Sequence, residues 1–250
     1  MDARKRSEVT LSIAIEWQPP TMLASPQSHG PLPLIIVPER HVDARGWFSE
    51  TFNQQRLYNL GITSRFVQDN QSLSKRKGTA RGFHFQSPPA AQAKLINVAR
   101  GRILDIVVDI RRGSPSYGMY VSAELSAENG QQVYVPPGFA HGFVSLDDDV
   151  LVSYKVSAYY SPVHDGGLRW DDPVIAFPWP FERTEMILSE KDRRLPYLIN
   201  FESPFPYEGN PLTELRVCSV CEPTDSCIPI MVTGEVDFIG SALARRADSR

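Results

Sequence analysis

Residues 80–95, ARGFHFQSPPAAQAKL, combine three cationic or titratable side chains with two phenylalanines that indicate a buried β-strand. Arg81 and His84 lie beside the phenylalanines, and Lys94 begins the apolar run that follows. A buried charge without a partner is costly, so core strands normally exclude such residues. The histidine could transfer protons near neutral pH, and the two cations could hold an anionic ligand. These residues are therefore either surface charges or parts of a site.

Two further polar residues stand in apolar strand sequence. His141 opens HGFVSL after a Pro-Pro-Gly turn, and Tyr154 lies in LVSYKVS. Taken singly, a strand histidine is more often a structural residue, and a buried tyrosine usually only anchors its hydroxyl. A small antiparallel barrel, however, can hold one ligand among its inward-facing side chains. The convergence of five polar groups on several strands favours a site: Arg81, His84, Lys94, His141 and Tyr154.

Strict alternation along a strand would separate Arg81 from His84. It places His84 on one face with Gly82 and Gln86, and Arg81 on the other face with the phenylalanines. Gly82 can support a β-bulge, which would turn Arg81 toward the face of His84. A bulge at Gly82 is therefore expected if the two side chains share a site.

The elements that must position these residues are short strands separated by turns. From residue 34 to about 160, runs rich in β-branched and aromatic residues are broken by Gly, Pro and Asp. The run KLINVA is joined through RG to RILDIVVDI, which predicts a tight hairpin. In the second run Leu104, Ile106, Val108 and Ile110 alternate with Asp105, Val107 and Asp109.

Only NQQRLYNLG resembles a short helix, with Gly61 as its C-terminal stop. Many short strands with closely spaced turns predict an all-β fold, an antiparallel sandwich or barrel of jelly-roll type with few short helices. Composition divides the chain into a flexible leader (1–33), a jelly-roll domain (34–204) and an irregular extension (205–250).

The composition is that of an ordinary globular protein. A formal charge of −3 gives no general attraction for nucleic acid or an anionic membrane. No apolar run approaches the roughly 20 residues that span a bilayer, and the N-terminus lacks the apolar segment of a signal peptide. The three cysteines all lie in the last segment, which predicts no disulfide framework. We therefore expect a cytoplasmic protein that binds neither nucleic acid nor membrane.

Several long motifs resemble one known family. In order along the chain they are DARGWFSETF, QDNQSLSKRKGTARGFHFQ, AQAKL, VYVPPGFAHGF, SYKVSAYYSP, LRWDDP and ILSEKD. Over about residues 34–199 the chain resembles the dTDP-4-dehydrorhamnose 3,5-epimerase family, whose members are cupin-type jelly rolls. The resemblance implies conversion of dTDP-4-keto-6-deoxyglucose to dTDP-4-keto-L-rhamnose, without a metal or redox cofactor. It also implies a homodimer that exchanges strands between subunits.

The resemblance assigns four catalytic roles. His84 matches the family's base, and Asp192 matches the carboxylate that orients it. Lys94 matches a lysine near the keto oxygen, where a fixed cation would stabilise an enolate. Tyr154 matches the acid on the opposite face of the sugar. Without the resemblance, the charged sequence around Asp192 would be interpreted as a solvated turn.

The resemblance also implies a binding set for the nucleotide sugar. Arg81 and Arg45 suit the pyrophosphate, and Phe48 and Glu50 match positions that contact thymine, Glu50 in the site of the neighbouring subunit. Trp170 is more readily explained by packing. The chain departs from the family near His164, where a glutamate is usual. The expected binding residues are Arg45, Phe48, Glu50, Gln68, Asn70, Arg81 and His141.

Three alternatives remain open. Two histidines on a jelly roll could serve a metal-dependent cupin oxygenase, although no H-x-H pair with a following glutamate is present. The chain could also be a non-catalytic nucleotide-sugar-binding protein. Within the family, inversion of a single carbon in another deoxysugar pathway is the nearest alternative.

The C-terminal sequence IPIMVTGEVDFIGSALARR resembles the first strand, turn and helix of short-chain dehydrogenase-type nucleotide-sugar enzymes. Thr233, Gly234 and Gly240 are in register with the TGxxGFIG pattern, but Asp237 replaces the middle glycine, where the backbone must approach a pyrophosphate. One βα fragment cannot build such a site. Cys218, Cys221 and Cys227 fall short of the four ligands of a structural zinc site. We expect residues beyond about 205 to be poorly packed, a chain ending near Phe201 to remain active, and no NAD binding.

Overall fold

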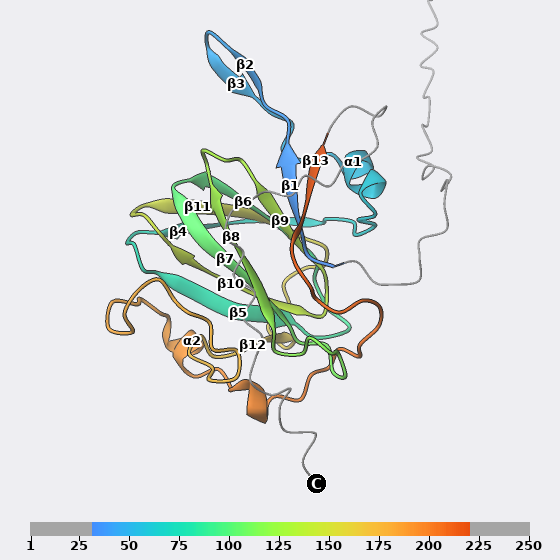
Figure 1. Ribbon diagram of the computed structural model, residues 1–250, viewed down its shortest axis with the longest axis vertical. Helices are drawn as coiled ribbons and strands as arrows, with labels where there is room; N and C mark the ends of the chain where they lie inside the picture. The colour runs from blue at the N-terminus through green and yellow to red at the C-terminus, as the bar shows by residue number, and fades with distance from the viewer. Residues whose placement is uncertain (1–31, 221–250) are drawn as a thin grey trace, which may run out of the picture.

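The computed structural model describes residues 32–220, which form two main β-sheets (Figure 1). The larger sheet has the strand order β13–β1–β9–β6–β11–β4. Its neighbouring strands are antiparallel except β13, which runs parallel to β1. The strands are β1 (Leu34–Pro38), β4 (Gln68–Ser74), β6 (Lys94–Arg100), β9 (Gln132–Val135), β11 (Val150–Val156) and β13 (Arg216–Val220).

The smaller sheet is antiparallel, with the order β12–β5–β10–β7–β8. Its strands are β5 (Ala80–Gln86), β7 (Arg102–Asp109), β8 (Tyr120–Ser126), β10 (Phe139–Ser145) and β12 (Asp165–Gly167). A separate hairpin projects away from both sheets (Figure 1). It consists of β2 (His41–Asp43) and β3 (Gly46–Phe48). The helical elements are α1 (Gln54–Asn59), α2 (Glu190–Arg193) and the 3-10 helix η1 (Leu198–Asn200).

The main core lies between the two sheets. Ile96 and Val152 of the larger sheet pack in the same buried cluster as Val107 of the smaller sheet. A second cluster covers the other face of the smaller sheet, where Ile106 packs with Leu168 from the segment after β12. Strand β7 is therefore buried on both faces, and the predicted alternation of its apolar side chains is confirmed. The set Ile106, Val108 and Ile110 belongs to the second cluster.

The predicted fold class is confirmed: the domain is a mostly antiparallel, cupin-like jelly roll. Its two sheets remain separate and do not close into a barrel. The short predicted helix is also present as α1. The side chain of Asn53 caps its N-terminus by accepting hydrogen bonds from the N–H groups of Gln55 and Arg56, and Gly61 follows its end with a φ of 81°. No helix within residues 32–220 is long and apolar enough to cross a membrane.

The predicted hairpin between residues 94–100 and 102–109 is wrong. Strand β6 belongs to the larger sheet and β7 to the smaller sheet, so the connection carries the chain from one layer to the other. Gly101 makes this corner with a φ of 77°, and a Cβ atom there would lie 2.8 Å from Cγ2 of Val150. Sequence alternation identifies a strand but does not say in which sheet it pairs, so the short connection was misinterpreted.

The extension is packed against the domain as far as the structure describes it. Phe205 and Leu212 are buried, and β13 extends the larger sheet beside β1. The Arg112 N–H donates to the carbonyl of Phe205, and the Tyr207 N–H donates to the carbonyl of Arg112. The prediction of poor packing beyond residue 205 is therefore wrong for residues 205–220. Thr233, Gly234, Asp237, Gly240, Cys221 and Cys227 lie outside the described residues.

Candidate active site

The expected bulge lies at Gly82. His141 of β10 pairs with His84 of β5, but Phe143 pairs with Arg81, so β5 carries one extra residue between these pairs. Gly82 has a φ of 114°, and a Cβ atom there would lie 2.6 Å from both the Cα of Gly142 and the carbonyl oxygen of His141. Only glycine fits this position. The irregularity brings Arg81 and His84 to the same cavity, which confirms the prediction.

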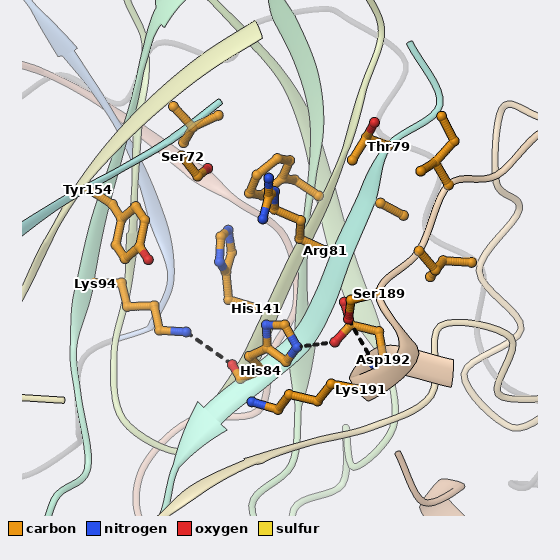
Figure 2. A pocket seen from close by; sticks show the side chains of 15 residues that line it. Ser72, Thr79, Arg81, His84, Lys94, His141, Tyr154, Ser189, Lys191 and Asp192 are labelled. Carbon is orange, nitrogen blue, oxygen red and sulfur yellow. Dashed lines mark hydrogen bonds and ion pairs between the residues drawn. The ribbon is translucent and has the colours of Figure 1, made fainter. Parts of the chain in front are cut away.

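A cavity of about 540 Å³ opens between the sheets near α2 (Figure 2). Strand β5 and its neighbour β10 line it from the smaller sheet, while β4, β6 and β11 line it from the larger sheet. The segment from Ile187 to Asp192 forms a further wall. The cavity brings together six residues predicted from sequence: Arg81, His84, Lys94, His141, Tyr154 and Asp192.

His84 and Asp192 form a close pair. Nε2 of His84 lies 2.6 Å from Oδ1 of Asp192, whose side chain is almost fully buried. Burial acts to raise the pKa of Asp192, but hydrogen bonds from His84, the Ser189 hydroxyl and the Gly82 N–H outweigh it and lower that pKa. An ionised carboxylate can only accept, so Nε2 carries the proton and Nδ1 is left as a base.

Asp192 reaches this position because a short helix begins beside the cavity. Ser189 is the N-cap of α2, and its hydroxyl oxygen accepts a hydrogen bond from the Asp192 N–H. The carboxylate therefore points from the first turn of α2 toward β5 (Figure 2). The sequence SEKD contains the cap and the carboxylate, but their contact with His84, 108 positions away, is tertiary.

Lys94 is the first residue of β6, and its side chain reaches toward β5. Its Nζ donates a hydrogen bond to the backbone carbonyl of His84 over 3.1 Å. Burial lowers the pKa of Lys94 to about 8, although the charges of Asp165 and Asp105 act in the opposite direction. The cavity thus holds an ammonium group close to the base.

Tyr154 faces the cavity from β11, in the sheet opposite His84. Burial raises the pKa of its phenol, and the charge of Arg81 only partly offsets this effect. The hydroxyl therefore keeps its proton at neutral pH and is available as a donor. His84 and Tyr154 can therefore contact a bound molecule from opposite sides.

Sequence reasoning missed a second histidine–carboxylate pair. Nε2 of His141 lies 2.7 Å from Oδ2 of Asp105, and both side chains are buried. Asp105 lies on the face of β7 that carries Val107, as its position in the alternating sequence predicts. A carboxylate at an inward position of a core strand was the available signal, because such a group needs a partner.

One more charged residue at the cavity and its ion-pair partner were not predicted. Lys191 of α2 lines it, and its Nζ forms an ion pair with Asp165 of β12. Asp165 also accepts a hydrogen bond from the hydroxyl of Tyr160 over 3.0 Å. His164, where the sequence departs from the family pattern, bonds through Nδ1 to the Ser161 hydroxyl. Asp165 thus supplies a carboxylate one position after His164.

Three of the expected binding residues lie away from the cavity of their own chain. Arg45 and Phe48 belong to the projecting β2–β3 hairpin, where Arg45 pairs with Asp43 and Phe48 is 70% exposed. Glu50 follows the hairpin and pairs with Arg56 of α1. None of the three lines the cavity that contains His84.

Gln68 and Asn70 lie on β4, and the side-chain amide of Gln68 donates a hydrogen bond to that of Asn70. Asn70 pairs across the sheet with Tyr154 and shares an adjoining hollow with it. Ser72, two positions further on the same face, lines the main cavity. Asn70 therefore lies beside the cavity, and Gln68 contacts Asn70 from the same strand. Trp170 is buried against Met186 and Trp179, as expected for a packing residue.

Within residues 32–220, no group of three or more His, Cys, Asp or Glu side chains is arranged to hold a metal ion. Each cavity histidine is instead held by one carboxylate.

Comparisons with known proteins agree with this geometry. Residues 31–200 match the family profile of dTDP-4-dehydrorhamnose 3,5-epimerase. The chain is 50% identical over 173 residues to the dTDP-4-dehydrorhamnose 3,5-epimerase of Sinorhizobium fredii, covering 69% of this chain and 88% of that protein. It is 37% identical over 146 residues to a dTDP-4-dehydrorhamnose 3-epimerase of Streptomyces niveus, covering 58% of this chain and 70% of that protein.

A solved structure resembles the domain equally well. The dTDP-6-deoxy-D-glucose-3,5-epimerase of Legionella pneumophila, in complex with dTDP-4-keto-L-rhamnose, superposes with a TM-score of 0.66 at 41% identity. The alignment covers 70% of this chain and 93% of that structure. Sequence and architecture therefore agree that the chain belongs to the dTDP-4-dehydrorhamnose 3,5-epimerase family of isomerases.

Proposed function

We propose that the protein epimerises dTDP-4-keto-6-deoxy-D-glucose at C3 and C5, giving dTDP-4-keto-L-rhamnose for deoxysugar biosynthesis. The observation that carries this proposal is the placement of a carboxylate-paired base and a protonated phenol on opposite sheets of one cavity. Inversion next to a ketone requires removal of a proton from one face of the sugar and its return to the other. His84 and Tyr154 lie on the two sides of the cavity from which these two proton transfers would occur.

The proposed mechanism starts with proton abstraction by Nδ1 of His84. The Asp192 carboxylate holds the other ring nitrogen and stabilises the imidazolium that forms. Negative charge then develops on the keto oxygen, where the ammonium group of Lys94 can stabilise it. The Tyr154 hydroxyl returns a proton to the opposite face of the carbon.

The charges around the cavity suit an anionic nucleotide sugar. Arg81 lines it, and its guanidinium is a cation of the kind that binds phosphate oxygens. Lys191 and Lys94 add further cations to the lining. Gln68 and Asn70 add amide groups for the phosphates or the sugar. We infer that these groups hold the dTDP moiety.

We also propose that the active unit is a homodimer in which β2–β3 reaches the partner's cavity. The hairpin exposes Val42, Trp47 and Phe48 to the extent of 78%, 56% and 70%, an unusual apolar surface for a monomer. Arg45, Phe48 and Glu50 would then serve the site of the neighbouring subunit. Projection of the hairpin away from its own sheets supports this arrangement (Figure 1).

The function is tested by deuterium exchange. The purified protein is mixed with dTDP-4-keto-6-deoxyglucose in deuterated water, and incorporation at C3 and C5 is followed by NMR. We expect deuterium at both carbons, no exchange with His84→Ala, and retained deprotonation with Tyr154→Phe. Incorporation at one carbon alone would identify a single-carbon epimerase, the activity named for the Streptomyces niveus relative.

The same assay separates the epimerase from a metal-dependent cupin enzyme. Activity that survives treatment with a chelator supports the proposal. Loss of activity that returns on addition of iron or zinc would contradict it, as would unchanged exchange by His84→Ala.

A further inference from the structure

Asp105 is a buried charge that the mechanism proposed above does not use. Asp105 lies in the middle of β7 and is 1% exposed, with apolar residues before and after it in the strand. Its Oδ2 contacts Nε2 of His141 over 2.7 Å, and its Oδ1 has no hydrogen-bond partner within the described residues. A buried carboxylate with one unsatisfied oxygen is a poor stabilising element, because apolar replacement of such groups is often neutral or favourable.

The position of this pair connects it with the catalytic residues. His141 is the direct cross-strand partner of His84 in the β5–β10 ladder, so both imidazoles reach the cavity from neighbouring strands of one sheet. Asp105 is paired with Phe143, which makes it a diagonal neighbour of His141. Asp105 itself does not line the cavity. Any effect on a ligand must therefore pass through His141.

The hydrogen-bonding chemistry of the pair is determined by the carboxylate. An ionised carboxylate can only accept, so the proton of a neutral His141 ring must lie on Nε2. Nδ1 is then an acceptor, and it has no hydrogen bond to any described residue. The neighbouring cavity groups Arg81, Lys94 and Tyr154 are donors. An oriented acceptor at this place can receive a hydrogen bond from a sugar hydroxyl.

We propose that Asp105 is a positioning residue for the epimerase reaction, which orients the ring of His141 and fixes its Nε2–H tautomer so that Nδ1 accepts a hydrogen bond from the substrate sugar. This inference rests on the proposed function, since it assigns a task to a second histidine of the same cavity. Asp105 thus orients His141 in the same way as Asp192 orients His84. Its effect is on substrate binding geometry and not on the catalytic base.

A double-mutant cycle tests the proposal. Asp105→Asn keeps the volume of the side chain but can donate to Nε2 and thereby permits the wrong tautomer. We expect it to lower kcat/KM for deuterium exchange by roughly 10- to 100-fold, as for other residues that orient a functional histidine. In a His141→Gln background the same change should cost less than about twofold, because the residue through which Asp105 acts is absent. An unchanged rate with Asp105→Asn, or an equal loss in both backgrounds, would overturn the proposal.

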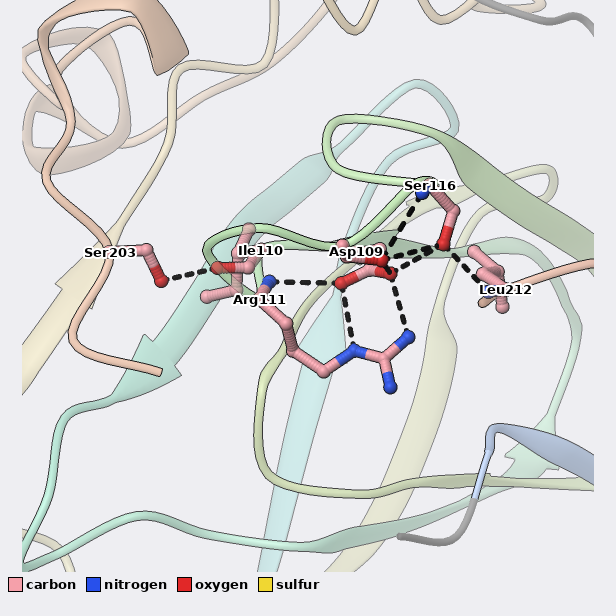
Figure 3. Close-up of polar contacts among 7 residues, drawn as sticks. Asp109, Ile110, Arg111, Ser116, Ser203 and Leu212 are labelled. Atoms are coloured by element: carbon pink, nitrogen blue, oxygen red, sulfur yellow. Dashed lines mark hydrogen bonds and ion pairs between the residues drawn. The ribbon is translucent and has the colours of Figure 1, made fainter. Parts of the chain in front are cut away.

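Asp109 provides the matched control on the same strand. It is buried like Asp105, but it accepts hydrogen bonds from Arg111, Ser114 and Ser116 in a cluster that also bonds to the Leu212 backbone (Figure 3). We expect Asp109→Asn to lower the melting temperature while the folded protein keeps kcat/KM within about twofold. Equal kinetic losses for the two variants would mean that Asp105 acts through the fold alone.

Imidazole ¹⁵N NMR of the wild-type protein supplies a readout that depends on neither activity nor a variant. We expect His141 to be protonated at Nε2 and unprotonated at Nδ1, and to lose this single tautomer in Asp105→Asn. A wild-type His141 protonated at Nδ1 would overturn the inference. If the wild type fails to exchange deuterium, the proposed function fails, while the tautomer still tests the role of Asp105.

Discussion

Single residues in the cavity depend on partners from other strands, and Lys94 shows what this means for pH dependence. Its ammonium group must stay protonated to stabilise an enolate, yet burial lowers its pKa to about 8. The pKa values of the free enzyme appear in the pH profile of kcat/KM. The upper limit of activity is therefore set by a residue whose usual pKa lies far higher.

We predict that kcat/KM for exchange falls as pH rises through about 8, because Lys94 then loses its charge. Lys94→Arg should retain some activity and lose this alkaline decline, since a guanidinium stays charged. Lys155→Arg, a change on the same β11–β6 sheet at a residue paired with Asp69, is the control and should keep the wild-type profile. If kcat/KM of Lys94→Arg still falls at alkaline pH, the decline belongs to the titration of another group.

The same shift affects stability with a defined sign. The folded pKa of about 8 lies below the ordinary 10.5, so the folded state binds fewer protons than the unfolded state between these pH values. The penalty for burying charged Lys94 is therefore complete below about pH 8 and relieved as pH rises toward 10.5. Lys94→Met should raise the melting temperature more at pH 7 than at pH 10. An equal rise in melting temperature at pH 7 and pH 10 would contradict the lowered pKa of Lys94.

At the scale of elements, the bulge in β5 decides which side chains share the cavity. Regular pairing would place Arg81 and His84 on opposite faces, whereas the extra residue at Gly82 puts both on one face. The glycine is required for two reasons, a φ of 114° and close approach of the β10 backbone.

We predict that Gly82→Ala abolishes exchange and destabilises the domain by well over the ~1–3 kcal/mol of backbone strain alone. Gly113→Ala is the control, because Gly113 also has a positive φ, 87°, but a Cβ atom there meets nothing within 4 Å. The Gly113→Ala variant should lose only the unfolding free energy that backbone strain costs, and it should keep its activity. Urea unfolding and the exchange assay measure the two effects. Equal losses of unfolding free energy in Gly82→Ala and Gly113→Ala would argue against a steric role for Gly82.

At the scale of the whole molecule, the described extension is part of the domain. The Leu212 side chain joins the core between the sheets, and its N–H donates to the Ser116 hydroxyl. The guanidinium of Arg111 lies 5.2 Å from the ring centre of Tyr207. These contacts replace the expectation from sequence that a chain ending near Phe201 keeps its fold.

We predict that a chain ending after Phe201 melts at a lower temperature than one ending after Val220. Leu212→Ala in the full chain should cost about 2–5 kcal/mol, the usual range for a buried leucine. Val163→Ala, at a residue 89% exposed, is the control and should change little. Identical melting of both truncated chains would show that residues 202–220 are dispensable.

The proposed exchange of hairpins predicts complementation between inactive chains. His84→Ala removes the base, and Phe48→Ala with Glu50→Ala removes the hairpin contacts. A refolded mixture should recover activity, because a mixed dimer then holds one site with both the intact base and an intact hairpin. Size-exclusion chromatography with light scattering checks the dimer. A dimeric mixture that stays inactive would contradict the shared site.

The sequence by itself determined the strand content, the short helix at 54–59 and five polar cavity residues on strands, because alternation, capping and polar residues in apolar strands are local signals. Asp192 was indicated only by the family resemblance. The sequence also indicated the bulge, since Gly82 stands between two residues that regular pairing would separate. Only the tertiary structure decided how strands are distributed between sheets, that Asp105 supports His141, and that residues 205–220 pack on the domain. Each of these depends on contacts between distant parts of the chain: β6 and β7 join separate layers, Asp105 lies 36 positions from His141, and Leu212 lies 96 positions from Ser116. Local patterns carry no information about such pairings, because the same apolar strand or buried carboxylate can be satisfied by many partners.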